Sequence, residues 1–446
     1  MIERGARLTL EIEKPAAGGR MLARHAGQVV LVAGTMPGER ITARIERVGK
    51  GVAFADTEAV IVASPDRRPG SADWRCGGDA FSHIAYPRQL ALKAQVIQDA
   101  FTRIGRLPLG TTPDVIASPQ HGYRMRARLH VQGTRIGFFR EGTHDICDAA
   151  VSRQLLPATL EWIASAAGTL RSLAETSGGR QQAIKGLELS ENAPGTSRAV
   201  HLDLHAGANP TAFAGLAEGL VGLSAQAADA RMPKVLAGVP AIDDEIDVGG
   251  GQRLTLRRSV RAFFQGNRFL LNPLVQHVLS RVGSEAVVDL YAGVGLFGLS
   301  LAAAGAQDVT LVEGDPISGA DLAGNAEPFA DRVVVRQQSV EAFLASATRG
   351  SQAPRSARSF RTAAGAPGPK GQVFVVDPPR TGLTREALAG IINHEPSRIV
   401  YVSCDVATLA RDARTLVDAG WGLAEITGID LFPNTAHVES IAVFER

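Results

Sequence analysis

Three short apolar runs in the second half of the chain constrain its fold most, because each of them leads into residues that can take part in catalysis or ligand binding. The runs VVDLY at 287–291, QVFVVD at 372–377 and RIVYVSC at 398–404 have the composition of buried parallel strands. In an open α/β sheet, the carboxyl ends of the parallel strands meet at one crevice. The sequence therefore predicts that the thiol of Cys404, the carboxylate of Asp377 and a glycine turn are gathered there.

The same alternation of strands and helices extends through residues 251–446. It predicts strands at 286–291, 308–313, 332–336, 372–377 and 398–403, and a final pair at 423–430 and 437–445. We expect a Rossmann-like, doubly wound α/β sheet. Residues 346–371 are rich in Ser, Ala, Gly and Pro and carry several arginines. They are expected to form a disordered insertion, and transient contact of these arginines with RNA stays open.

The first half of the chain predicts smaller units, since 446 residues are too many for one ordinary core. Residues 1–62 alternate apolar and polar positions between turns, which predicts a small β-barrel. Its basic side chains fit RNA binding, although they could equally form a solvated surface. Residues 63–106 are predicted to be a linker followed by a helix. Helical spacing in 85–106 predicts an apolar face made by Leu90, Leu92, Val96, Ile97, Phe101 and Ile104. Residues 107–250 are predicted to form a central α+β domain with no readable chemistry of its own.

Composition narrows the class of protein. A hydrophobic content of 45% and a charged content of 21% are typical of a soluble globular protein. Residues 287–306 are long enough to cross a membrane, but a carboxylate and several glycines interrupt them, so no membrane partner is expected. The start of the chain lacks the apolar core of a signal peptide, and three cysteines are an odd, small number. We therefore expect a cytoplasmic, reducing environment.

The glycine turn predicts the ligand of the crevice. Residues 289–298 contain only one Gly-x-Gly, which alone is weak support for a nucleotide. The next predicted strand ends in Glu313, eighteen residues after Gly295, where dinucleotide and adenosyl sites hold ribose hydroxyls. No complete phosphate-binding loop follows, which favours S-adenosylmethionine over a cofactor with a pyrophosphate. The simpler alternative for Glu313 is an acid on a surface loop.

Five segments together resemble one family, the RNA uracil-5-methyltransferases that use S-adenosylmethionine. The segments are SVRAFFQGN at 259–267, DLYAGVG at 289–295, DPPRTGL at 377–383, YVSCDVATLARD at 401–412 and FPNTAHVE at 432–439. Their order and spacing match over the C-terminal half of the chain. The N-terminal barrel resembles the TRAM domain that many members carry. The joint match is far more specific than any single motif.

The resemblance implies particular roles for these residues. Uracil C5 is a poor nucleophile, and a thiolate that adds to C6 activates it; the resemblance makes Cys404 that nucleophile and Glu439 the base that removes the C5 proton. It also places four residues around S-adenosylmethionine, namely Gln265, Tyr291, Glu313 and Asp377. From the residues alone, Cys404 could be an inert thiol, Glu439 a solvated strand acid and Asp377 the cap of a turn.

Two departures from the family concern cysteine chemistry. Many relatives hold an iron–sulfur cluster on four cysteines, but the corresponding stretch here retains only Cys76. Asp79 and Ser152 stand in place of two others, and Cys147 is near but off register. No iron–sulfur cluster and no metal are expected, because one or two thiols cannot supply a four-thiolate site. Asp405 follows the nucleophile, and we expect its carboxylate to point away from the thiol.

These observations predict a monomeric RNA methyltransferase that makes 5-methyluridine. The favoured substrate is 23S ribosomal RNA, and the alternative is the T-loop uridine of transfer RNA. The alternative stays open because a basic barrel would bind RNA without distinguishing its sequence. The net charge of +2 neither demands nor excludes nucleic acid. Two other classes stay open: an amino-group methyltransferase with a structural Cys404, and a catalytically silent RNA-binding or ribosome-assembly factor.

Overall fold

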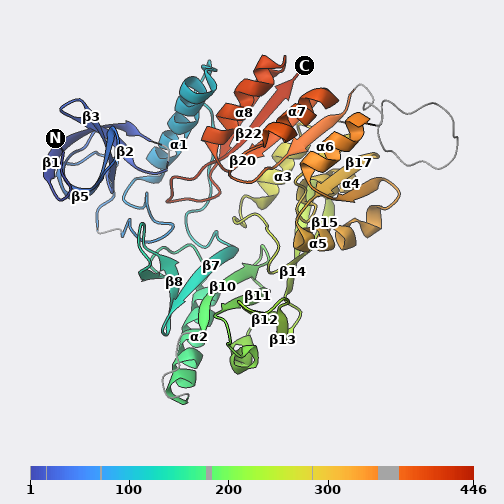
Figure 1. Ribbon diagram of the computed structural model, residues 1–446, viewed down its shortest axis with the longest axis horizontal. Coiled ribbons are helices and arrows are strands. Elements are labelled where there is room, and N and C mark those ends of the chain that lie inside the picture. The colour runs from blue at the N-terminus through green and yellow to red at the C-terminus, as the bar shows by residue number, and fades with distance from the viewer. Residues whose placement is uncertain (1, 17, 71–72, 177–182, 284, 350–370) are drawn as a thin grey trace.

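Three folded units are visible in the computed structural model, which describes residues 2–446 except 17, 71–72, 177–182, 284 and 350–370 (Figure 1). The first is a closed barrel with strand order β1-β2-β3-β5-β4, as predicted. Its strands are β1 (Arg7–Pro15), β2 (Met21–His25), β3 (Gln28–Ala33), β4 (Arg40–Val48) and β5 (Val52–Val62). In β4, Ile41, Ala43 and Ile45 are buried whereas Arg40 and Arg44 are exposed. The apolar residues of the alternating pattern therefore pack inside the barrel, and the basic ones lie on its surface.

The helix α1 (Tyr86–Ala100) leads from the barrel to the large sheet, and a single π-helical turn, η1 (Phe101–Gly105), continues it (Figure 1). A proline in its first turn suits the start of a helix, because that position needs no backbone N–H. The helix was expected to bury an apolar stripe. It buries Leu92 and Ile97 as predicted, but it also buries Gln89 and Lys93.

The central unit is built on a seven-stranded sheet of order β13-β12-β11-β10-β7-β8-β9. The strands are β7 (Arg126–Gln132), β8 (Arg135–Phe139), β9 (Ile146–Asp148), β10 (Ile184–Glu191), β11 (Arg198–Leu204), β12 (Gly222–Ala227) and β13 (Lys234–Gly238). Helix α2 (Pro157–Thr176) and a 3₁₀ segment, η2 (Pro210–Ala217), pack against it through Trp162, Ile163 and Phe213. These apolar contacts give the unit a core of its own.

The third unit is an eight-stranded sheet of order β18-β17-β16-β19-β20-β22-β21-β6. Its strands are β6 (Val115–Ile116), β16 (Val287–Leu290), β17 (Val309–Glu313), β18 (Val333–Gln337), β19 (Val373–Val376), β20 (Arg398–Ser403), β21 (Gly422–Ile429) and β22 (Glu439–Glu445). All seven strands predicted after residue 251 are present, within two residues of the expected bounds. The strands from β18 to β20 are parallel, and β22 runs antiparallel to both β20 and β21.

Helices cover both faces of this sheet, which confirms the doubly wound fold. They are α3 (Leu271–Leu279), α4 (Leu296–Ala303), α5 (Pro316–Ala326), the short η3 (Glu327–Phe329), α6 (Val340–Arg349), α7 (Arg385–His394) and α8 (Val406–Asp418). Successive side chains of β16 enter different cores: Val287 packs with α3, α4 and α5, whereas Val288 and Leu290 pack with α1, α6, α7 and α8. Among the helices of the described residues, none combines the length and apolar character needed to span a bilayer.

The structure corrects two of the expected boundaries. The strand β6 falls within 107–250 but pairs with β21 at the edge of the large sheet. The limit at 250 lies in the turn of a hairpin formed by β14 (Ala241–Gly249) and β15 (Gln252–Ser259), whose Ile246 and Leu254 join the core beneath the large sheet. The run of glycines at 249–251 can be read either as a turn or as a linker. The pairing of the two flanking strands, which decides between them, is seen only in the structure.

The structure describes the predicted insertion at 346–371 only at its two ends. Residues 350–370 lie outside the described residues. Residues 346–349 belong to α6, so the helix continues further than the composition indicated.

Candidate active site

Strand pairing brings the predicted nucleophile and the predicted base together. β20 and β22 are antiparallel, with Arg398 opposite Glu445 and Ser403 opposite Ser440. Cys404 is the next residue after Ser403, and Glu439 is the residue before Ser440, so the two lie at the same end of this strand pair. Cys404 is half-buried and carries a free thiol, while Glu439 is buried. Two residues that are 35 positions apart in the sequence therefore share one site.

Asp377 and Arg380 join this pair from the neighbouring strand. Asp377 follows β19 directly, and β19 is paired in parallel with β20, so the two strands end side by side. Burial raises the pKa of Asp377 to about 7. Burial and the nearby charge of Asp377 raise the pKa of Glu439 well above its usual range. Arg380 is exposed and opposes this shift at Glu439.

The thiol is held in its protonated form by the same surroundings. Burial raises the pKa of Cys404 to about 11, and the charges of Glu439 and Asp377 add to the shift. The guanidinium of Arg380 acts in the opposite direction. Because the site gathers more negative than positive charge, a cationic ligand would favour ionisation of its acids.

The carboxylate of Asp405, the residue after the nucleophile, caps the start of a helix. Asp405 is the N-cap of α8, and its Oδ1 accepts hydrogen bonds from the backbone N–H of Ala407 and Thr408 at 3.0 and 2.9 Å. This cap satisfies two donors that would otherwise lack a partner. The expectation that Asp405 points away from Cys404 fits this arrangement.

A second part of the site is the turn between β16 and α4. Glu313, at the end of β17, accepts hydrogen bonds from the N–H of Gly293 at 2.7 Å and of Asp315 at 2.6 Å. Tyr291 begins the turn with a φ of 64°, a strained value for a residue other than glycine, and such residues gather at functional sites. A side chain added at Gly293 would meet no atom within 4 Å, so the backbone is open to a ligand.

The residues of this turn fit an adenosyl ligand. Glu313 ends the strand next to β16, where a carboxylate can reach ribose hydroxyls, and the open backbone at Gly293 allows close approach. Gln265 reaches the same area, because its Nε2 donates to Oδ2 of Asp377 at 3.4 Å. The side chain of Tyr291 is half-buried and packs against the core on the α6–α8 side of the sheet. All four residues therefore lie at or beside the carboxyl ends of β16, β17 and β19.

Asp289 is a residue of this site for which the sequence analysis predicted no role. Its Oδ2 accepts from the N–H of Gly298, in the first turn of α4, at 2.8 Å, whereas its Oδ1 is buried without a partner among the described residues. Burial raises the pKa of Asp289 to about 8. The available signal was a single acid inside an apolar strand, since such an acid needs a buried partner.

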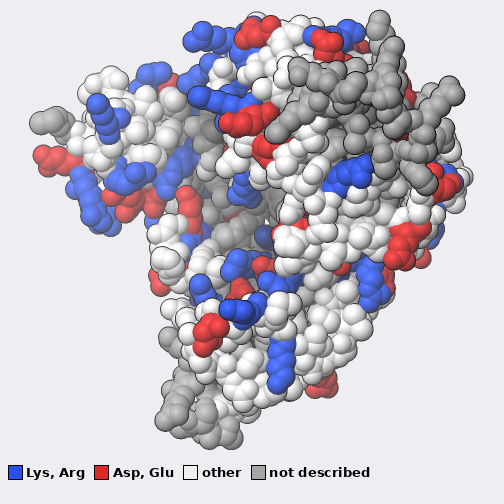
Figure 2. Space-filling model, turned by 45° about the vertical axis from the view of Figure 1, so that its right-hand side comes forward, with Lys and Arg blue, Asp and Glu red and all other residues white. Residues whose placement is uncertain are grey.

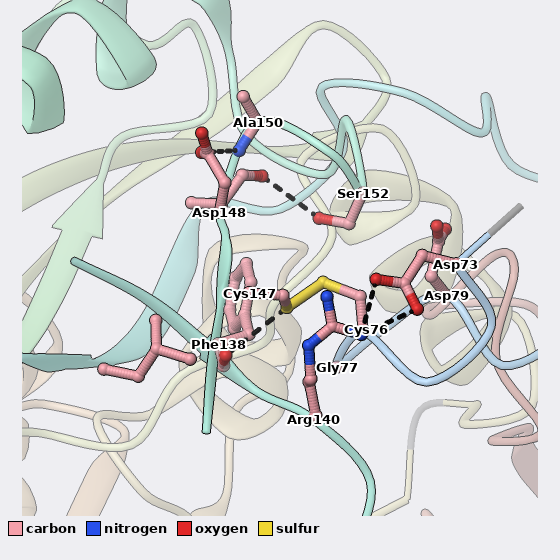
Figure 3. The surroundings of a disulfide bond; sticks show 12 residues. Asp73, Cys76, Gly77, Asp79, Phe138, Arg140, Cys147, Asp148, Ala150 and Ser152 are labelled. Atoms are coloured by element: carbon pink, nitrogen blue, oxygen red, sulfur yellow. Dashed lines mark hydrogen bonds and ion pairs between the residues drawn. A yellow bond between two sulfur atoms is a disulfide. The ribbon is translucent and has the colours of Figure 1, made fainter. Parts of the chain in front are cut away.

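The loop that corresponds to the cluster-binding segment of relatives contains a disulfide instead. Cys76 and Cys147 are joined, with their Cα atoms 5.7 Å apart (Figure 3). Ser152 donates to the carbonyl of Ala149, so it is engaged locally. The third cysteine of the chain is Cys404, at the carboxyl end of β20. These residues do not fit a four-thiolate cluster.

Loss of this disulfide is expected to weaken the attachment of residues 73–79 to the central sheet. The bond closes a separation of 71 residues, and disulfides that close such loops contribute about 2–4 kcal/mol. Cys147→Ala should therefore lower the midpoint of urea unfolding, and dithiothreitol should lower that of the wild type to a similar value. Cys404→Ala is the matched control and should keep its sensitivity to dithiothreitol. Wild-type unfolding that is insensitive to the reductant would contradict the pairing.

Comparison with known proteins agrees with this geometry. Residues 223–446 match the family model described as tRNA (uracil-5-)-methyltransferase, and residues 2–57 match the TRAM domain. A 23S rRNA (uracil(1939)-C(5))-methyltransferase of Pseudomonas putida is 32% identical over 461 residues, covering 99% of this chain and 94% of that protein. The protein of the same description from Methylococcus capsulatus is 31% identical over 465 residues, covering 98% and 97%.

A solved structure shares the fold over nearly the whole length. The tRNA (uracil-54, C5)-methyltransferase of Pyrococcus abyssi, in complex with S-adenosyl-L-homocysteine, has a TM-score of 0.71 at 22% sequence identity. The match covers 98% of this chain and 99% of that one. The family model, the relatives and the fold agree with the five sequence segments, and the chain belongs to the RNA uracil-5-methyltransferase family.

Proposed function

We propose that this protein transfers a methyl group from S-adenosylmethionine to C5 of a uridine in RNA. The observation that supports the proposal is the pairing of β20 with β22, because Cys404 directly follows the last pair, Ser403–Ser440, and Glu439 directly precedes it. The charges of Glu439 and Asp377 both act on the thiol. Covalent activation of uracil needs a thiol and a base that can both reach the same small ring, and Cys404 and Glu439 supply these two groups. S-Adenosylmethionine, when bound, supplies the methyl group as an electrophile.

The side chains of the pair act in sequence. The thiolate of Cys404 adds to C6 of the uracil, which forms an S–C6 bond and shifts the electrons of the C5–C6 double bond towards C5 and O4. After C5 has gained the methyl group, the carboxylate of Glu439 removes the remaining C5 proton. The C5–C6 double bond then re-forms, the S–C6 bond breaks, and Cys404 leaves as a thiolate. The C5 proton ends on Glu439 and passes from there to solvent. The thiol of Cys404 gives its own proton to solvent before it adds to C6 and takes up a proton again after it leaves, which returns the enzyme to its starting state.

The acids around the ligand suit a positively charged sulfonium. Asp289, Glu313, Asp377 and Glu439 each have a raised pKa because of burial, so each would be stabilised in its ionised form by a cation. Gln265 donates a hydrogen bond to Asp377 through its amide nitrogen. The chain therefore gathers acidic side chains at the ends of the strands beside the thiol, where a cation would promote their ionisation.

Affinity for S-adenosylmethionine is expected to depend on pH through Asp377. The pKa of this acid is raised to about 7, so it is mostly neutral at pH 6 and mostly ionised at pH 8. If the ionised form holds the ligand, the dissociation constant should fall by about tenfold between these two pH values. Isothermal titration calorimetry measures this directly, and Asp377→Asn should bind weakly with a flatter pH profile. Equal wild-type affinity at both pH values would contradict this role of Asp377.

The surface around the site suits RNA. Figure 2 shows a hollow between the upper and lower parts of the molecule, with both basic and acidic side chains around it. On the barrel, Arg40, Arg44 and Arg47 of β4 are exposed, and Arg47 lies 3.9 Å from the centroid of the Phe54 ring. Exposed cations and aromatic faces are the groups that bind phosphates and bases. A target uridine must leave its stack to reach a thiol in this position.

Ribosomal RNA is the favoured substrate. The relatives with 32% and 31% identity are described as 23S rRNA methyltransferases, and they match along nearly their whole length. Transfer RNA is the alternative, because the family model and the archaeal structure carry that description. The basic barrel does not discriminate between them, since contacts to phosphate carry no sequence information.

Transfer of labelled methyl groups to unmodified 23S rRNA and to transfer RNA, followed by mapping of the modified base, tests the proposal. We expect 5-methyluridine in 23S rRNA. 5-Methyluridine in transfer RNA would keep the chemistry and change the substrate. A methyl group on an exocyclic amine would refute the thiolate mechanism. No transfer to either RNA, together with no binding of S-adenosylmethionine, would favour a silent RNA-binding factor.

A further inference from the structure

We infer that Gln89 and Lys93 of α1 are positioning residues for Glu439, and that they hold the loop before it in the conformation that removal of the C5 proton needs. The inference rests on the proposed function of Glu439. It adds a contribution from the segment between the barrel and the central unit, a part of the chain to which no catalytic role was assigned.

The loop in question, residues 430–438, connects the end of β21 to Glu439, the first residue of β22. At its centre, Asn434 has a φ of 62°, a left-handed conformation that is uncommon outside glycine, although asparagine tolerates it better than most residues. Asn434 is buried, with 3% of its surface exposed. Such a conformation persists where surrounding contacts determine it, so the neighbours of Asn434 fix the shape of the loop.

Gln89 supplies several of these contacts. Its Oε1 accepts from the N–H of Asn434 at 2.9 Å, and its Nε2 donates to Oδ1 of the same residue at 2.9 Å. The same Nε2 lies 3.0 Å from the carbonyl oxygens of Phe81 and Ile84. Phe81 in turn donates its N–H to the carbonyl of Asn434 at 2.7 Å. The fully buried Gln89 thus ties the backbone and the side chain of Asn434 to the segment before α1.

Lys93 fixes the first part of the same loop from one helical turn further on. Its ammonium lies 2.5 Å from Oδ1 of Asp430 and 3.1 Å from the carbonyl oxygen of Phe432. Both Lys93 and Asp430 are buried, with exposed side-chain fractions of 1% and 0%. Residues four apart on a helix lie on the same face, so Gln89 and Lys93 act on the loop together.

A purely structural helix would not need these side chains. The predicted interface of α1 was apolar, and burial of a glutamine and a lysine carries a desolvation cost that only good partners offset. Here, most of these partners belong to one loop, which leads directly into Glu439. The nucleophile stands apart from this arrangement, because Cys404 follows β20 and α8 begins just after it.

This separation gives the inference a specific kinetic signature. Glu439 adjoins the loop, and among the described residues its backbone is paired only with Ile429 of β21, whereas Cys404 lies between β20 and α8. Displacement of the loop should therefore shift Glu439 more than Cys404 or the turn at Gly293. Addition of the thiolate and methyl transfer should continue, whereas removal of the C5 proton should become slow. RNA should then remain covalently attached to Cys404. A general loss of stability would reduce all steps together and leave no attached RNA.

The test uses the full-length protein with Gln89→Met, which keeps the volume of the side chain but removes its hydrogen bonds. Gln95→Met is the matched control, since residue 95 lies on a different side of the same helix. The readouts are kcat and KM with RNA, affinity for S-adenosylmethionine, the melting curve, and covalent RNA–protein adduct on a denaturing gel. We expect kcat to fall at least about tenfold in Gln89→Met with adduct accumulating, and KM to fall with it, so that kcat/KM changes less than about twofold.

A second variant covers the case in which Gln89→Met does not fold. Asn434→Gly adopts the left-handed conformation without strain but loses the side-chain bond to Gln89, and it should also accumulate adduct. Wild-type turnover in either folded variant, or slow turnover without adduct, would overturn the positioning role. Glu439→Gln serves as the reference: if it forms no adduct, the proposed base itself is wrong, and the failure lies with the proposed function rather than with α1.

Discussion

Replacement of Cys404 by alanine is expected to abolish methyl transfer, with a fall in kcat/KM of at least about 10⁴-fold, because the uracil ring would lose its activating nucleophile. The other two cysteines of the chain are joined to each other in the central unit, so neither can substitute for it. Transfer of labelled methyl from S-adenosylmethionine to the RNA substrate measures this effect. Covalent RNA–protein adduct should be absent as well.

Binding of S-adenosylmethionine and thermal stability provide the controls for this variant. The turn at Gly293 and the carboxylate of Glu313 lie on β16 and β17, so the affinity of Cys404→Ala for the ligand should stay within about twofold of the wild type. Cys404→Ser should be nearly as inactive, because a hydroxyl is far less acidic than a thiol. Activity that survives in Cys404→Ala would refute covalent catalysis and would favour methylation of an exocyclic amine.

The strand ends of the methyltransferase sheet could be predicted because they depend on local patterns. Apolar runs of strand length reveal buried parallel strands, and the carboxyl ends of such strands meet at one edge. This was sufficient to bring Cys404, Asp377 and the turn after β16 to one site. The relation of Cys404 to Glu439 could not be read in the same way, because it depends on β22 inserting between β20 and β21. Only the resemblance to the family indicated that pair.

Buried polar residues were the main feature that local patterns missed. Helical spacing in residues 85–106 predicted an apolar interface that included Ile104, yet 47% of Ile104 is exposed, whereas Gln89 and Lys93 are buried. These two side chains are buried because a distant loop offers them partners, and a periodic pattern contains no information about that loop. The pairing of Cys76 with Cys147 has the same origin, since it depends on the contact between a loop and the edge of the central sheet.

Replacement of Glu439 by glutamine is expected to trap the reaction after methyl transfer. The amide keeps the shape of the side chain but cannot accept the C5 proton, so the S–C6 bond cannot break. Loss of a general base reduces the rate by about 10²–10⁴-fold, and the enzyme should stop after less than one turnover. The expected result is a protein band of reduced mobility on a denaturing gel, which carries both the RNA and one labelled methyl group per adduct.

The presence or absence of the methyl label in the adduct shows whether Glu439 acts after or before methyl transfer. A methylated adduct requires that thiolate addition and methyl transfer precede the step that Glu439 performs. The double variant Cys404→Ala, Glu439→Gln should form no adduct, because the bond to RNA starts at the thiol. An adduct without the methyl label would mean that Glu439 acts before methyl transfer. Normal turnover in Glu439→Gln would assign proton removal to another carboxylate, and Asp377 is the acid whose charge is felt directly at Glu439.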